Sequence, residues 1–221
     1  MNVELEITED GSHTLSVPGL KEHYHSVHGA ISESQHIFIN AGLKHVPENK
    51  KTISILEIGF GTGLNALLTF LETSGKKINC NYTSIELYPL DEKIFTSLNY
   101  PSLLGIEENI FLQLHRCKWN EEIKISEYFS LNKKNISADK IDEASSFFDL
   151  VYFDAFAPDI QPEMWTEEIF RKLFECMKTG AVLATYSTKG NVKRILKGVG
   201  FAIEKLPGPK GKREILRAVK K

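Results

Sequence analysis

The segment ILEIGFGTGLN, residues 55–65, places three glycines at alternate positions directly after an apolar run. The run predicts a buried strand, and the apolar spacing of residues 64–75 predicts a helix after it. Gly59, Gly61 and Gly63 then form the strand-to-helix turn, where an open α/β sheet binds ligands at the carboxyl ends of its strands. This junction favours a parallel α/β sheet over other architectures.

Strand and helix patterns alternate from residue 53 onward, as in a Rossmann-like α/β sheet covered on both faces. We expect strands at residues 53–60, 80–87, 109–115, 147–156, 181–188, 201–206 and 213–219, and helices at residues 64–75, 89–100, 166–180 and 191–200. The last two strands can form a hairpin through PGPKGK. The charged stretch 126–146 predicts a surface insertion.

The N-terminal fifty residues follow a different pattern. Residues 3–17, VELEITEDGSHTLSV, alternate apolar and polar side chains around Asp10-Gly11, which predicts a β-hairpin. Residues 20–43 lack a clean period and predict a loop with a short helix. We therefore expect a small N-terminal segment, residues 1–50, that works as one unit with an α/β domain at residues 51–221.

Composition and charge exclude several classes of protein. The apolar runs are short and the first thirty residues have no signal-peptide core, so we expect a cytoplasmic protein without a membrane span. Cys80, Cys117 and Cys176 are widely spaced, which favours reduced core thiols over disulfides or a metal site. Residues 189–221 hold eleven Lys or Arg against two Glu, whereas the rest of the chain is acidic. This basic end predicts contact with a nucleic acid, with a solvated surface as the alternative.

The glycine turn has the chemistry of an anion cradle. Without Cβ atoms its backbone can approach a ligand closely, and the helix that starts near Asn65 directs free N–H groups at a carboxylate or phosphate. The spacing G-x-G-x-G after Glu57 differs from that of dinucleotide enzymes and is similar to the loop of S-adenosylmethionine enzymes. Glu86, at the end of the second strand, is then a candidate for binding ribose hydroxyls. A tight turn without a ligand and an ordinary surface glutamate are the alternatives.

The fourth expected strand lies in the segment FDLVYFDAFAPDIQPEMW, which begins at residue 148. Asp149 and Asp154 bracket LVYF, and Asp154 would emerge at the ligand-binding end of that strand. A carboxylate there can hold a cationic amine, and Phe156 can stack on a base. The alternative is that Asp154 only caps a turn.

Several motifs together resemble one family. EIGFGTGLN, DAFAPDIQPEMW, ATYSTKGNVKRILKGVGF and GPKGKRE occur in this order, after YHSVHGAISESQHIF. They resemble the methyltransferase domain of the MnmC family, which completes 5-methylaminomethyl-2-thiouridine at the tRNA wobble position. The resemblance runs from Tyr24 to Ala218 and is to the stand-alone, MnmD-type form, because the chain ends at Lys221 with no room for an FAD-dependent oxidase domain. It implies a class I S-adenosylmethionine-dependent fold with seven strands, the last one antiparallel.

The resemblance also implies roles for individual residues. It implies that S-adenosylmethionine is bound by the glycine turn and second strand, namely Glu57, Gly59, Phe60, Gly61, Gly63, Asn65 and Glu86, and by a flap of Tyr24, Ser26, Gly29, Glu33 and Ser34. It makes Asp154 and Phe156 the catalytic residues, with Asp154 orienting the aminomethyl group and Phe156 beside the uracil ring. It also places Lys189, Lys210, Lys212 and Arg213 on the tRNA backbone. Many members have Gly-Asp after the third strand, where this chain has LHRCKWN, so the adenine contact is open among His115, Cys117 and Trp119.

The implied reaction is methylation of 5-aminomethyl-2-thiouridine in tRNA, with no metal and with other enzymes supplying the aminomethyl precursor. Two alternatives remain. One is a methyltransferase or aminopropyltransferase for a small amine, which needs no basic hairpin. The other is a non-catalytic RNA-binding protein of the same fold.

Overall fold

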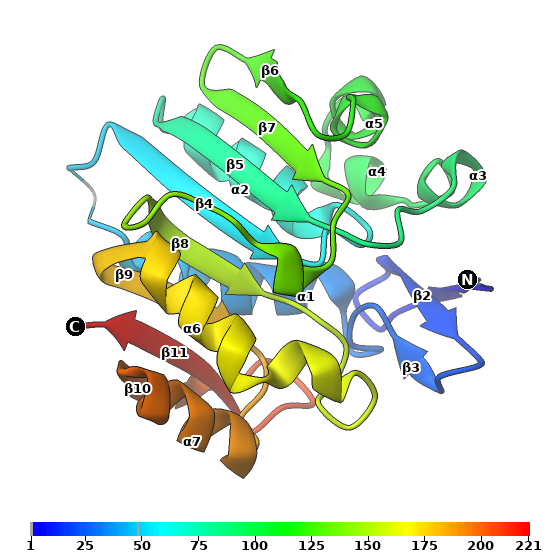
Figure 1. The fold of residues 1–221 in the computed structure, drawn as a ribbon. Helices are drawn as coiled ribbons and strands as arrows, with labels where there is room; N and C mark the ends of the chain where they lie inside the picture. The colour runs from blue at the N-terminus through cyan, green and yellow to red at the C-terminus, as the bar shows by residue number, and fades with distance from the viewer. Residues whose placement is uncertain (1, 48) are drawn as a thin grey trace.

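The computed structural model describes residues 2–47 and 49–221 and has an eight-stranded sheet at its centre (Figure 1). The strands, in sheet order, are β10 (Phe201–Pro207), β11 (Glu214–Lys220), β9 (Met177–Thr185), β8 (Phe148–Phe153), β4 (Thr52–Ile58), β5 (Asn79–Ile85), β7 (Phe129–Lys134) and β6 (Glu122–Ser126). Strands β9, β8, β4, β5 and β7 run parallel. β11 is antiparallel to both neighbours, β9 and β10, so the predicted Rossmann-like sheet with an antiparallel last strand is confirmed. β6, antiparallel to β7, adds an eighth strand that was not predicted.

Helices cover both faces of this sheet (Figure 1). One face carries α1 (Ala30–Ser34), the π-helix η1 (Gln35–Asn40) and α2 (Leu64–Gly75), and the other carries α6 (Glu167–Cys176) and α7 (Gly190–Val199). Neighbouring residues of β4 supply the two cores, because Ile55 packs in the cluster with α2 and Leu56 in the cluster with α6. Each such side chain contributes about 1.5 to 3 kcal/mol when it leaves water. This burial on both faces fixes the carboxyl end of the sheet.

The segment 109–115 is a helix and not the predicted third strand. It belongs to α5 (Glu108–Arg116), whose buried residues are Phe111, Leu114 and His115. These residues recur at spacings of three and four, which is the period of a helix, whereas a strand buries alternate residues. The prediction was wrong because NIFLQLH is short and fits both periods loosely.

The third strand of the core sheet is β7, inside the stretch 126–146 that was predicted to be a surface insertion. Its buried residues alternate as Phe129, Leu131 and Lys133. The Lys133 ammonium donates to the carbonyl oxygen of His115 and lies 4.5 Å from the ring centroid of Trp119. A buried lysine satisfied in this way made the strand look too polar for the core.

Two predicted helices have different limits. The helix expected at 89–100 is replaced by α3 (Glu92–Phe95) and α4 (Tyr100–Leu104). The helix expected at 166–180 ends at Cys176, because Met177 already pairs with Phe148 at the start of β9. Short helical turns complete the chain at η2 (Leu43–His45), η3 (Ala138–Lys140) and η4 (Pro162–Trp165).

The predicted N-terminal hairpin is present as β1 (Glu4–Ile7) and β2 (His13–Val17), and β3 (Glu22–His23) extends it to three strands. The Tyr100 hydroxyl donates to the carbonyl oxygen of His13 at 2.8 Å, and Leu15 belongs to the same buried cluster as α2. The N-terminal segment therefore shares a core with the sheet domain. A boundary near residue 50 stays a prediction.

Three further observations concern the described part of the chain. No helix in it is long and apolar enough to cross a membrane. It contains no group of three His, Cys, Asp or Glu side chains placed to hold a metal ion. All three cysteines are free thiols.

Candidate active site

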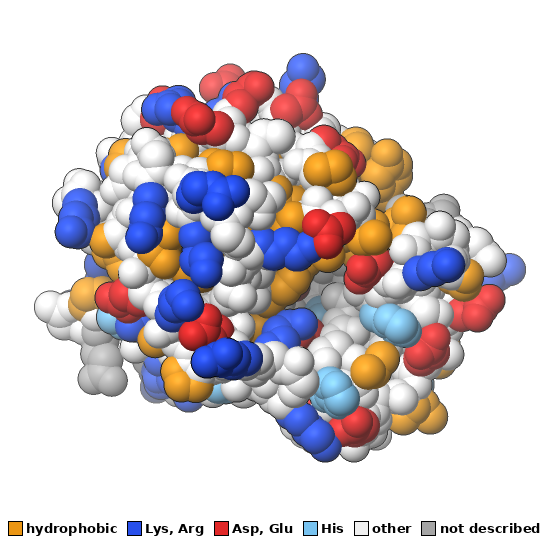
Figure 2. All heavy atoms as spheres, turned by 90° about the horizontal axis from the view of Figure 1, so that it is seen from below, with side chains coloured by type: hydrophobic (Ala, Val, Ile, Leu, Met, Phe, Trp, Pro, Cys, Tyr) orange, Lys and Arg blue, Asp and Glu red, His pale blue; other side chains and the backbone are white. Residues whose placement is uncertain are grey.

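A cavity of about 740 Å³ lies at the carboxyl ends of the parallel strands. Figure 2 shows a hollowed face, with Lys and Arg gathered on the half over the C-terminal elements and histidine and acidic side chains on the other half. The volume is in the range of small-molecule and cofactor sites. The wall includes eleven of the residues predicted for the site, namely Tyr24, Ser26, Glu33, Gly59, Phe60, Gly61, Asn65, Glu86, Asp154, Phe156 and Lys212.

The glycine turn lies on this wall and packs closely on two sides. Gly59 and Gly61 have φ angles of +93° and +48°, in the region that favours glycine. A Cβ on Gly59 would lie 2.6 Å from the carbonyl oxygen of Asp154, and one on Gly61 would lie 3.1 Å from the ring of Tyr24. The bare backbone therefore lets the end of β4 touch the end of β8 and the N-terminal segment.

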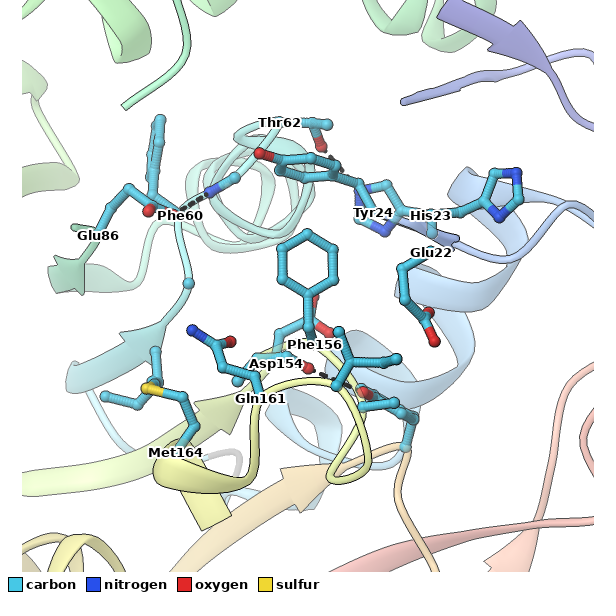
Figure 3. A pocket seen from close by; sticks show the side chains of 18 of the residues that line it. Glu22, His23, Tyr24, Phe60, Thr62, Glu86, Asp154, Phe156, Gln161 and Met164 are labelled. Carbon is cyan, nitrogen blue, oxygen red and sulfur yellow. Dashed lines mark hydrogen bonds between the residues drawn. The ribbon is translucent and has the colours of Figure 1, made fainter. Parts of the chain in front are cut away.

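Glu86 is held beside the glycine turn (Figure 3). Its Oε2 accepts a hydrogen bond from Gly61 N at 3.1 Å, and its Oε1 accepts one from Tyr88 N at 2.7 Å. Two backbone amides therefore fix the carboxylate on the cavity wall. A fixed carboxylate at the end of the second parallel strand can accept hydrogen bonds from ribose hydroxyls.

Residues 22–28 form the N-terminal side of the cavity. The ring of Tyr24 meets Phe156 edge-on, with centroids 5.2 Å apart (Figure 3). His25 Nε2 lies 2.7 Å from Thr62 Oγ1, which ties this segment to the glycine turn. Burial lowers the pKa of His25 to about 4, so the imidazole is neutral at pH 7.

Asp154 follows β8 and faces the same cavity. Its Oδ2 accepts a hydrogen bond from Asn65 Nδ2 at 2.8 Å. Burial raises the pKa of Asp154 to about 7, more than the hydrogen bond from Asn65 and the charge of Lys212 lower it. The carboxyl group can therefore both accept and release a proton near neutral pH, as acid and base groups of active sites do.

Glu57 lies under the wall instead of on it. Its side chain is fully buried, and its Oε2 accepts a hydrogen bond from Ser84 Oγ at 2.6 Å. Burial raises the pKa of Glu57 to about 8, so the acid is protonated at pH 7. Glu57 also interacts with the side chain of Asn65, the residue that holds Asp154. Glu57 can thus act on the cavity through Asn65.

Three other residues predicted to bind the cofactor also lie off the wall. A Cβ on Gly29 would lie 2.5 Å from an oxygen of Asp10, and one on Gly63 would lie 2.7 Å from His115 Nε2. Ser34 is fully buried in α1. All three lie where the segments around the cavity pack together, so any effect on a ligand would pass through their neighbours.

Lys212 was predicted to contact the tRNA backbone, and in the structure its side chain also lies at the main cavity. It lines the cavity, with its Nζ 3.2 Å from Glu33 Oε1 and 5.1 Å from the ring centroid of Tyr186. Glu33 Oε2 in turn accepts a hydrogen bond from Ser26 N at 2.8 Å. Lys212 therefore connects the turn between β10 and β11 to the N-terminal segment.

The other predicted RNA-binding residues lie nearby. Lys210 Nζ is 2.5 Å from Glu9 Oε2, and Lys189 pairs with Asp159. Arg213 is exposed. Contact of these side chains with RNA stays a prediction.

Sequence reasoning missed part of the wall beyond Glu86. Leu87, Ile136 and Ala138 line the cavity there, and Ile136 and Ala138 follow the true third strand β7. His115, Cys117 and Trp119, considered for adenine binding, are not on the wall, because His115 lies in helix α5 and the other two follow that helix. His115 instead packs against Phe95 and the glycine turn. A correct assignment of β7 would have pointed to residues 135–138.

Comparison with known proteins gives a consistent result. The model of an S-adenosyl-L-methionine-dependent methyltransferase family matches residues 107–221. The tRNA 5-methylaminomethyl-2-thiouridine biosynthesis bifunctional protein MnmC of Magnetococcus marinus is 31% identical over 89% of this chain and 31% of its own length. The chain thus spans about a third of the length of the curated relatives it matches.

Solved structures extend the comparison. The crystal structure of MnmC2 from Aquifex aeolicus is 30% identical, with a TM-score of 0.81 over 100% of this chain and 70% of that one. Spermidine synthase of Thermotoga maritima, at 10% identity and a TM-score of 0.62 over 98% of this chain and 68% of that one, shares the fold. The family match, the 30% sequence identity to MnmC2 and the cavity at the glycine turn agree. The chain belongs to the MnmC family of S-adenosyl-L-methionine-dependent methyltransferases.

Proposed function

We propose that this protein transfers a methyl group from S-adenosylmethionine to the primary amine of 5-aminomethyl-2-thiouridine at the wobble position of tRNA. The observation that carries the proposal is Asp154, a carboxyl group with a raised pKa beside Phe156 on the wall of a cofactor-sized cavity. The likeness to MnmC2 over the whole chain supports the same reaction. Such a reaction belongs in the cytoplasm, downstream of enzymes that supply the aminomethyl precursor.

The cavity wall has groups that fit each part of S-adenosylmethionine. The glycine turn and the N-terminus of α2 offer a bare backbone and a positive dipole end to the methionine carboxylate. Glu86, fixed by two amides, would hold the ribose, and the apolar side chains of Leu87 and Ile136 would face the adenine. When bound, the cofactor supplies an electrophilic methyl group on a sulfonium.

Asp154 would prepare the acceptor amine. An alkylammonium has a pKa of about 10, so proton transfer to an ordinary aspartate of pKa about 3.9 is uphill by about 8 kcal/mol. Transfer to a carboxylate of pKa about 7 is uphill by about 4 kcal/mol. Burial therefore removes about half of this cost, and the hydrogen bond from Asn65 holds the carboxylate in one orientation. Asp154 would both orient the amine and accept its proton.

The four basic residues Lys189, Lys210, Lys212 and Arg213 would contact the tRNA backbone. They lie at the end of β9 and in the turn between β10 and β11, and three of them line either the main cavity or the hollow beside it. A base inserted beside Phe156 would bring its own strand to these side chains. Phosphate contacts of this kind position a nucleic acid without reading its sequence.

Mass spectrometry of nucleosides tests the proposal directly. Incubation with S-adenosylmethionine and tRNA that carries 5-aminomethyl-2-thiouridine should add one methyl group to that nucleoside. A protein that acts on a small amine would leave the tRNA unchanged and methylate or alkylate a polyamine. A non-catalytic RNA-binding protein would bind the tRNA and change neither.

A further inference from the structure

A second cavity, of about 330 Å³, adjoins the first. The two cavities share Ala157, Tyr186 and Lys212 as wall residues. The two cavities therefore adjoin at these residues, and a ligand held beside Asp154 can extend toward the second cavity. In a nucleotide the base is bonded to the sugar, and the sugar carries the flanking phosphates.

The wall of the second cavity is rich in anion-binding groups. Lys189, Lys212 and Arg213 line it, and Glu214, the one acidic side chain on this wall among the described residues, pairs with Lys205 at 2.9 Å. Lysine ammonium groups have three donors each, so Lys212 keeps donors beyond its contact with Glu33. The wall therefore attracts an anion and repels a polycation.

The N-terminus of α7 and the hydroxyl of Ser187 add hydrogen-bond donors to the positive charge of this wall. Lys189 is the N-cap of α7, a ten-residue helix, so the free N–H groups and the positive dipole end of α7 lie next to the cavity. Ser187, only 4% exposed, also lines the cavity and brings a hydroxyl donor to its wall. Cations, a hydroxyl and a helix N-terminus are the groups that bind phosphate in proteins.

We propose that the second cavity binds a phosphodiester that directly flanks the target nucleotide while the target base lies in the first cavity. This inference rests on the proposed function. A phosphate site would also make the enzyme selective, because a small polyamine has no phosphate to place there and its positive charge is repelled by Lys212 and Arg213. The second cavity thus favours a nucleotide acceptor over a free amine.

Binding the phosphodiester requires little rearrangement at Lys189. Its partner Asp159 has a side chain that is 76% exposed, and such surface ion pairs contribute little to stability. A phosphate can therefore replace Asp159 as the partner of Lys189. Asp159→Asn, which removes the competing carboxylate, should tighten RNA binding about twofold to threefold.

Methylphosphonate substitution can locate the contact. Anticodon stem-loops that carry 5-aminomethyl-2-thiouridine are made with one neutral methylphosphonate at each linkage in turn, and affinity is measured by fluorescence anisotropy. In the wild type, neutralising one flanking linkage should weaken binding about tenfold, as expected for a hydrogen bond to a charged group of about 1.5 kcal/mol. In Arg213→Gln the same neutral linkage should weaken binding less than in the wild type, about threefold, because one of the three charged partners is already gone.

Lys197→Gln is the matched control. Lys197 is exposed in the last turn of α7, away from the second cavity, and its loss changes the net charge by the same amount. The methylphosphonate effect should remain about tenfold in this variant. Melting temperatures of both variants should match the wild type, since both side chains are exposed.

The outcomes separate this inference from the proposed function. If the stem-loop is methylated but the neutral linkage weakens wild type and Arg213→Gln equally, the second cavity is not the phosphate site and the proposed function stands. An equal small effect at every linkage would also overturn the inference. If the stem-loop is neither bound nor methylated, the proposed function fails and the inference fails with it.

Discussion

Strand β8 carries an aspartate near each end, and the two carboxylates have opposite surroundings. Asp149, near the amino end, is 3% exposed and contacts the ammonium groups of Lys50 and Lys178, the latter at 3.0 Å. Asp154, just past the carboxyl end, accepts a hydrogen bond from Asn65 and faces the large cavity. The two residues are the same in type and lie five positions apart.

The two environments move the two pKa values in opposite directions. Burial raises the pKa of both carboxyls, but at Asp149 the hydrogen bonds from Lys50, Ser54 and Lys178 outweigh burial and hold the pKa below its ordinary value. At Asp154 burial prevails and the pKa is about 7. A carboxylate whose charge is satisfied stabilises the fold, and one whose charge is poorly satisfied is available for chemistry.

The largest difference should appear in catalysis. Asp154→Asn keeps the size of the side chain but removes the proton acceptor and the negative charge, so kcat should fall about 1000-fold, a rise of about 4 kcal/mol in the barrier. Single-turnover methyl transfer to the modified tRNA measures this loss. Calorimetric affinity for S-adenosylmethionine should stay within about threefold. A loss of less than about tenfold in kcat would remove Asp154 from its proposed role.

The same substitution at the other end of β8 should affect stability. Asp149→Asn removes the charge that Lys50 and Lys178 share. Because these lysine side chains are 35% and 39% exposed and can be hydrated, the expected loss is about 2 kcal/mol, below that of a fully buried pair. Urea denaturation measures it. A midpoint equal to that of the wild type would contradict the assignment, and kcat should remain near the wild-type value.

The contrast between the two aspartates could be predicted only in part. The apolar run of β8 placed Asp154 at the ligand-binding end, because strand limits depend on local sequence. The contacts of Asp149 with Lys50 and Lys178, and of Lys212 with Glu33, join residues far apart in the chain and have no local signal.

The same limit explains why part of the cavity wall was missed. The polar sequence of β7 hid a strand whose lysine, Lys133, is satisfied by a carbonyl group and an aromatic ring. With the third strand assigned to residues 109–115, the residues after the true strand were not considered. Gly59, Gly61 and Glu86 lie on the cavity wall because each follows closely on an apolar strand, and their binding of a cofactor stays a prediction.

The pH dependence of stability should separate the two carboxylates. The folded pKa of Asp154, about 7, lies above the unfolded value of about 3.9, so this group costs the wild type stability as pH rises from about 4 to 7. Asp154→Asn should thus gain about 1 to 2 kcal/mol over the wild type across this range, because partial exposure of the carboxylate reduces the full effect. Urea denaturation from pH 4 to 8 measures it.

Asp149 should behave in the opposite way. Its folded pKa lies below the unfolded value, so its contribution is present above about pH 4 and is lost as pH falls through the folded pKa. The difference between wild type and Asp149→Asn should therefore shrink in acid. A difference that grew as the pH fell would show that Asp149 is not stabilised as a carboxylate.

The smallest effect on kcat is expected at Glu57, which is buried behind the cavity wall. Glu57 Oε1 and Asn65 Oδ1 are buried oxygens that have no donor among the described residues, so we expect a proton on Glu57 to be donated to Asn65. Burial raises the pKa of Glu57 to about 8, which keeps that proton in place at pH 7. Glutamine has the shape of the protonated acid and also donates, so Glu57→Gln should keep kcat within about threefold, under about 0.7 kcal/mol.

Glu57→Asp is the informative partner of that variant. It keeps the carboxyl group but is too short to reach both Ser84 and Asn65, so Asn65 would no longer hold the Asp154 carboxylate in one orientation. Its kcat should fall below that of Glu57→Gln, and the acidic limb of its pH–rate profile should shift, while Glu57→Gln keeps the wild-type profile. If the aspartate variant were the more active of the two, the charge of Glu57 would matter more than its hydrogen bond to Asn65, and Asp154 would not depend on the residue beneath it.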